Sequence, residues 1–268
     1  MEGKRRQGGI GLAVAVALIY VFLLLPIIIV VLAAFNAGEY LSFPPQGFSL
    51  RWFEKFFSSE PFVRSFIFSL RLAFITTCIS TVIGTMASFY VVRYSRIGKD
   101  FLRVLHTAPM MLPGMLTGTA LLIFFYTIGL GGTYAGLLLG HVLVTMPYVF
   151  LAVSAALYNF DRSLEEAARS LGARPFTTLG RITLPLIKGG IISGAMFSFI
   201  TSFDQFPISL LLSGVGMTPL PIQVFDYLRF EFDPTAAAVG TVTIVMTAVI
   251  ILVTEKFVGL ESMYWGSK

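Results

Sequence analysis

One ionisable side chain in this sequence lies inside an otherwise apolar run, and it is the first candidate for chemistry. Asp204 sits in the sequence SFDQFP within the apolar segment 186–212. A charge inside a membrane is costly and usually faces a polar cavity or a partner. Pro207 also frees backbone groups there that another polar group must satisfy. We therefore expect Asp204 to line a pathway or an outer gate that favours a cationic substrate.

A purely structural role for Asp204 is the alternative. The carboxylate would then hold a neighbouring helix, for instance through Arg71, or cap a kink at Pro207. The Arg71 side chain is also long enough to snorkel outward instead of pairing. Aromatic side chains that we expect to line the same pathway, with helix packing or lipid contact as the alternative for each, are Phe203, Phe206, Tyr148, Tyr126 and Phe150.

Motifs of enzymatic chemistry are missing from the sequence. It contains no GxxxxGK[ST] loop for nucleotide phosphates, no HExxH zinc motif and no GxSxG nucleophile elbow. The two histidines, His106 and His141, fall on different apolar segments, and the single cysteine, Cys78, sits in an apolar run. We therefore expect no catalytic residue and no metal site, and any ATP that powers the protein must bind to another chain.

The most polar long segment within the apolar chain is Ser163–Pro185, SLEEAARSLGARPFTTLGRITLP. Ser163 and Glu166 have the spacing of a capping box, which predicts a helix start, and Gly172 suits the left-handed position that ends a helix. One apolar stripe at helical spacing consists of Leu164, Ala167, Ala168 and Leu171. Pro175 is able to open a second helix, and Pro185 disfavours helix at the residue before it. We interpret the segment as two short helices gripped by another protein; a hairpin packed on its own chain is the alternative.

Composition indicates a polytopic membrane protein. Of 268 residues, 56% are hydrophobic and 12% are charged, and the mean hydropathy is +0.84; soluble domains are about 25% charged. We expect an all-α fold in a single transmembrane domain, residues 1–268, with a loop at 159–185. The six expected spans are about 10–35, 65–92, 104–128, 134–158, 186–212 and 236–257. Segment 10–35 is longer than the apolar core of a signal peptide, so we expect an uncleaved first helix.

The basic residues predict the orientation of these spans. Fourteen of the 19 Lys and Arg residues fall in the N-terminus, the 93–103 loop, the 159–188 segment and the C-terminal tail. The positive-inside rule places those regions, including both termini, in the cytoplasm. This distribution also explains the net charge of +5 without nucleic acid as a partner.

The 163–185 segment resembles a known motif. Glu166-Ala167-Ala168, Gly172 and Ile182-Thr183-Leu184-Pro185 fill the pattern EAA-x3-G-x9-I-x-LP, which is similar to the cytoplasmic EAA loop of permease subunits of bacterial ABC importers. In that family the loop forms a coupling helix that docks into a groove on the ATPase. The resemblance implies that Glu166, Ala167, Ala168, Gly172, Leu184 and Pro185 belong to the docking surface. We also expect Glu165 or Glu166 to contact a basic group of the ATPase.

A second resemblance points to one branch of this family. The run Ser202–Ser209, followed by Gly214 and Leu220-Pro221, looks like the permeases of spermidine/putrescine-type importers, as does Arg93-Tyr94. Relatives in this branch also carry opines, phosphonates and ferric iron, so these substrates stay open beside polyamines.

The resemblance implies a subunit of an ATP-driven importer in the bacterial inner membrane. Its partners would be a second permease in a heterodimer, two copies of an ATPase that hold ATP and Mg, and a periplasmic binding protein. The alternative is an ion-coupled secondary transporter, which would need several ionisable groups within the membrane. Asp204 is the one residue that clearly qualifies.

Overall fold

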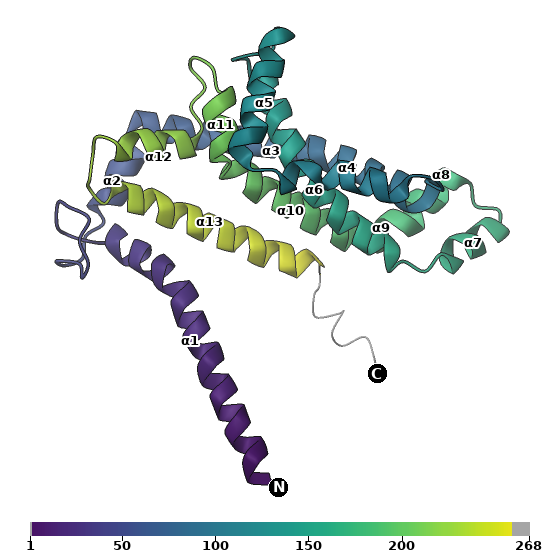
Figure 1. Cartoon of the computed structure of the whole chain (residues 1–268), viewed down its shortest axis with the longest axis horizontal. Coiled ribbons are helices and arrows are strands. Elements are labelled where there is room, and N and C mark those ends of the chain that lie inside the picture. The colour runs from purple at the N-terminus through teal and green to yellow at the C-terminus, as the bar shows by residue number, and fades with distance from the viewer. Residues whose placement is uncertain (1, 259–268) are drawn as a thin grey trace. The chain divides into compact units, whose positions relative to one another are not determined.

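The computed structural model describes residues 2–258, which are mostly helical (Figure 1). The all-α fold class is therefore confirmed. The elements of this part of the chain, in order, are α1 (Glu2–Ala34), α2 (Arg51–Ser58), α3 (Glu60–Phe89), the π-helical turn η1 (Tyr90–Tyr94), α4 (Lys99–Met111), α5 (Gly114–Thr127), α6 (Tyr134–Tyr158), α7 (Ser163–Ser170), α8 (Pro175–Thr178), the π-helical turn η2 (Leu179–Thr183), α9 (Leu184–Leu186), α10 (Lys188–Phe203), α11 (Phe206–Leu212), α12 (Leu220–Leu228) and α13 (Thr235–Val258).

Among the described residues, four helices are long and apolar enough to cross a membrane, or up to six if each of two bent pairs forms one span. The four continuous candidates are Gly11–Ala34, Glu60–Tyr94, Tyr134–Tyr158 and Thr235–Lys256. They fall within a few residues of the expected first, second, fourth and sixth spans. The expected third and fifth spans are the bent pairs, and they differ from the single straight helices that hydropathy suggests.

The expected third span, 104–128, is broken at Leu112–Pro113. Helices α4 and α5 meet there at an angle of 101°. The cause is local, because a proline ring disfavours helical backbone in the residue before it. Leu112 is accordingly extended, with φ −83° and ψ 143°.

The expected fifth span, 186–212, is interrupted twice. Its first break is at Ile187, where the Pro175–Leu186 segment and α10 differ in direction by 66°. Its second break is at Asp204 and Gln205, after which α11 begins with Pro207 in its first turn. Proline has no N–H to donate to the preceding turn, so the helical ladder cannot continue unbroken through this point.

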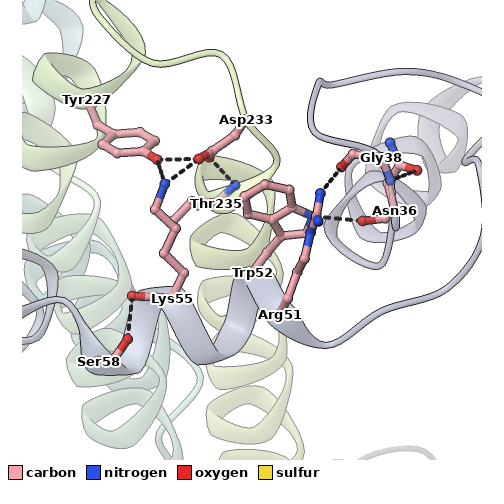
Figure 2. Close-up of polar contacts among 9 residues, drawn as sticks. All are labelled: Asn36, Gly38, Arg51, Trp52, Lys55, Ser58, Tyr227, Asp233 and Thr235. Carbon is pink, nitrogen blue, oxygen red and sulfur yellow. Dashed lines mark hydrogen bonds and ion pairs between the residues drawn. The ribbon is translucent and has the colours of Figure 1, made fainter.

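The described chain divides into two compact units, and each has its own core. The first consists of residues 1–63 and 224–246. Its apolar cluster joins Ala33 and Ala34 of α1, Trp52 of α2 and two alanines of α13. The indole N–H of Trp52 donates to the Asn36 carbonyl oxygen over 2.7 Å, as Figure 2 shows. Trp52 and Phe56 are therefore both buried in protein.

A polar cluster in the same unit joins α2 to the segment before α13 (Figure 2). The Lys55 ammonium donates to the Asp233 carboxylate and, over 3.0 Å, to the Tyr227 hydroxyl. These hydrogen bonds raise the pKa of Lys55 above its ordinary value. Burial alone would raise the pKa of Asp233, but hydrogen bonds from Lys55, Thr235 and Tyr227 lower it below the ordinary value. The cluster therefore favours the ionised form of both side chains.

The second unit consists of residues 64–223 and the end of α13. Helix α6 is its centre and packs along α10, as Figure 1 shows, and against α4 and α11. Gly190 and Gly194 make the close approach of α10 possible, since a Cβ at Gly194 would lie 2.8 Å from the Val149 Cα. Small residues four positions apart are a common device for packing helices in membranes. The loop segments and Asp204 are all positioned by this unit.

Candidate functional site

Helix α7 opens the loop between α6 and α10, but not with the expected capping box. No side chain caps its first turn, and the Ser163 N–H instead donates to the Asp161 carboxylate over 2.9 Å. This contact lowers the pKa of Asp161 below its ordinary value. The prediction failed because Asp161, two residues earlier, competes for the same amide in a local turn.

Gly172 ends α7 as its sequence position predicted. Its φ is +84°, in the left-handed region, and the Ala173 N–H returns to the Ala168 carbonyl over 3.0 Å. This is the hydrogen bond of a Schellman motif, which satisfies a carbonyl at the helix end. The turn sets the direction in which the second half of the loop leaves α7.

The second half of the loop continues through Pro185, where we had expected a stop. Pro175 is at the start of α8 as predicted, and η2 then connects α8 to α9. Leu184 is helical, with φ −58° and ψ −45°. A π-helical turn shifts the hydrogen bonding by one residue, and Pro185 then occupies the first turn of α9, where a missing N–H costs little.

Glu165 is held inside its own chain. Its Oε1 atom accepts a hydrogen bond from the Thr183 hydroxyl over 2.7 Å and lies 3.3 Å from the Arg93 guanidinium. Arg93 also lies over the Phe160 ring, 4.9 Å from its centre. Glu165 thus joins both halves of the loop to η1, a role that its sequence context did not reveal. Glu166 is exposed, so of the two glutamates it is the one free to meet a partner.

The loop presents apolar side chains that pack on nothing in the described chain. No residue of α7 is buried, and Leu171 and Phe176 are 89% and 87% exposed. Ala167, Gly172 and Pro185 are exposed as well. A hairpin packed on its own protein would have buried these apolar side chains, so the structure argues against that alternative. Large side chains left this exposed are a feature of surfaces that bind another protein.

Asp204 lies at the C-terminal end of α10, and its side chain is exposed. The ion pairs of the described residues are Lys55–Asp233 and Arg93–Glu165, so the suggested partnership between Asp204 and Arg71 is not formed. Arg71 instead lines an open groove of about 370 Å³ with Phe68, Phe74, Ile75 and Tyr134. The Asp204 carboxylate is therefore available to a ligand rather than used in a pair with Arg71.

The aromatic residues suggested for the pathway are not equivalent. Phe203 is 3% exposed and packs against Phe199 and Phe66, so it belongs to the helix packing. Tyr148 is half-buried and stacks on Phe197 with ring centres 6.5 Å apart. Phe206 is also half-buried. Tyr148 and Phe206 remain candidate lining residues, and Phe203 does not.

Comparison with known proteins identifies the family that has this architecture. Residues 80–260 match the family model described as the inner membrane component of binding-protein-dependent transport systems. The chain belongs to this family. The match includes the loop between α6 and α10 and the Asp204 break, the two features singled out by the geometry. It also decides against the ion-coupled secondary transporter that the sequence left open.

Curated relatives of this permease include polyamine transport proteins. It is 32% identical to the spermidine/putrescine transport system permease protein PotC of Haemophilus influenzae, over 86% of this chain and 89% of that one. It is 33% identical to the putrescine transport system permease protein PotI of Escherichia coli K12, over 81% of this chain and 79% of that one.

Solved structures share the fold of the permease. A chain from a bacterial ABC transporter that imports alginate has a TM-score of 0.74 at 17% identity, and 95% of this chain and 96% of that chain are covered. A chain of the MetNI methionine ABC transporter has a TM-score of 0.62 at 20% identity, and 75% of this chain and 98% of that chain are covered.

Proposed function

We propose that this permease moves a polyamine, spermidine or putrescine, from the periplasm to the cytoplasm as a subunit of an ATP-driven importer. The observation that carries the proposal is the similarity, along 86% of the chain, to PotC, whose name specifies spermidine and putrescine transport. An exposed carboxylate at the Asp204 break supports it, because a polyamine is a multiply charged cation at neutral pH.

The loop 159–185 is the proposed docking surface for the ATPase. Its exposed members Glu166, Leu171, Gly172, Phe176 and Pro185 would enter a groove on that subunit. ATP and Mg would be held by two ATPase copies, and a second permease and a periplasmic binding protein would complete the importer. The basic residues near the loop favour a cytoplasmic position for it and for both termini.

Uptake by the complete transporter tests the substrate. Cells that express the permease with its partner subunits, in a host without other polyamine importers, should accumulate labelled spermidine or putrescine. Excess unlabelled polyamine should abolish the signal, and excess phosphonate or ferric iron should leave it unchanged. Accumulation of an anion in place of a polyamine would contradict the proposal.

Glu165→Gln is expected to loosen the loop. It removes the charge that faces Arg93, whose side chain is 9% exposed. Because this ion pair is still partly exposed to solvent, its loss should destabilise the folded loop by about 1–2 kcal/mol. Hydrogen exchange of residues 163–183 should accelerate by roughly tenfold. Glu166→Gln, at the exposed neighbouring position, is the matched control and should leave exchange unchanged. Equal exchange in the two variants would rule out the internal role of Glu165.

Gly172→Val is expected to separate ATP hydrolysis from uptake. A Cβ at this position would meet no atom within 4 Å, so the effect comes from φ at +84°. The left-handed conformation costs a residue with a side chain about 1–2 kcal/mol. The turn between the halves of the loop would therefore shift. Uptake should fall at least fivefold while the complex still hydrolyses ATP. Asparagine tolerates this conformation better than valine, so uptake by the Gly172→Asn variant should lie between that of Gly172→Val and that of the parent.

A further inference from the structure

A buried histidine bridges the two helices on either side of the Asp204 break. His141, on α6, is completely buried. Its Nδ1 lies 2.9 Å from Ser202 Oγ near the end of α10, and its Nε2 lies 3.1 Å from Ser209 Oγ in α11. A neutral imidazole offers one donor and one acceptor, and a hydroxyl takes either role. One side chain thereby satisfies two buried serines that belong to different helices.

The break itself provides little rigidity along the chain. Asp204 has φ −98° and ψ 14°, and Gln205 has φ −75° and ψ 92°, so neither continues the helix. Pro207 has no N–H with which to restore the ladder. The relative placement of α10 and α11 therefore depends on contacts that each makes with its surroundings. His141 contacts one residue before the break and one after it.

The helix that carries His141 is held in turn by a second pair of hydroxyls. Thr145 Oγ1 donates to the His141 carbonyl over 2.8 Å, and it lies 2.8 Å from Ser80 Oγ on α3. Because the Thr145 hydroxyl donates its proton to the His141 carbonyl, the Ser80 hydroxyl must be the donor in the contact with Thr145. These contacts connect the histidine turn of α6 to α3, and the polar network as a whole joins four helices.

We propose that His141 is a positioning residue for transport. Through Ser202 and Ser209 it fixes where α10 ends and where α11 begins, and so fixes the place of the Asp204 carboxylate. This inference rests on the proposed role of Asp204 in the pathway and deepens it. His141 itself does not touch the substrate.

Variants of the complete transporter test this role in spermidine uptake. His141→Leu removes both ring contacts and should lower uptake about tenfold, through a higher KM, at an unchanged membrane level. His141→Gln keeps a donor and an acceptor and should recover most of the uptake. His106→Leu is the matched control: His106 donates one hydrogen bond, from Nδ1 to the Leu102 carbonyl in its own helix, and its ring stacks on Phe150. It should behave as the parent.

The decisive comparison is the double variant, because a residue that acts through another is not additive with it. His141→Leu combined with Asp204→Asn should be no worse than Asp204→Asn alone. Additive losses, normal uptake in His141→Leu, or normal uptake in Asp204→Asn would each overturn the inference. If His141→Leu fails to reach the membrane, Ser202→Ala with Ser209→Ala takes its place in the same comparison.

A failure of the proposed substrate is recognised separately. If the parent complex takes up no polyamine, the proposed function fails. ATP hydrolysis stimulated by the binding protein then replaces uptake as the readout for the same variants. Non-additivity with Asp204→Asn would still support the positioning role, and additivity would still contradict it.

Discussion

Phe176→Asp is expected to detach the ATPase from the permease. The ring is 87% exposed on α8 beside other exposed apolar side chains of the loop, and aromatic anchors of this kind contribute about 2–4 kcal/mol to an interface. Replacing it with a carboxylate should weaken ATPase binding by about 30- to 1,000-fold, and uptake should fall to background. The ATPase recovered with the purified permease is the measurement.

A phenylalanine on the other unit provides the control for that experiment. Phe48, in the loop between α1 and α2, is 75% exposed. Phe48→Asp adds the same charge at a similarly exposed ring outside the proposed docking surface. It should retain the ATPase. If both variants lost the ATPase, or if Phe176→Asp kept it, the loop would not be the docking surface.

Asp204→Asn is expected to impair recognition of a cationic substrate. The amide keeps the size of the side chain and removes the charge that we propose faces the substrate, so the KM for spermidine should rise about 10- to 100-fold. Basal ATP hydrolysis by the complex should change little, because the substitution lies away from the loop. Asp226→Asn, at an exposed carboxylate of α12, should leave the KM unchanged. An unaltered KM in Asp204→Asn would remove the residue from the pathway.

Hydropathy and glycine chemistry predicted much of this architecture. The fourth span was predicted at 134–158, and α6 is Tyr134–Tyr158. Gly172 adopts the expected left-handed conformation, and Pro175 opens its helix as expected. These features depend on neighbouring residues alone, so the sequence contains the information needed to predict them.

Some of the features that sequence reasoning missed depend on contacts between distant segments. The break at Leu112 is not one of them: it follows locally from Pro113, and it was missed because hydropathy treats 104–128 as one helix. The pairing of Glu165 with Arg93 joins residues 72 positions apart, and the contact of His141 with Ser202 joins residues 61 positions apart. Local spacing carries no signal for such pairs. Their residue types offered one hint, since a buried polar side chain needs a partner.

The proposed docking of the 159–185 loop on the ATPase can be tested most directly by cross-linking in intact cells. A photoreactive amino acid placed at Phe176 should, on illumination, attach the permease to its ATPase. A bulky thiol reagent added outside the cells should fail to label a cysteine at the same position. Cross-links confined to the permease itself, or labelling from outside the cell, would contradict the account.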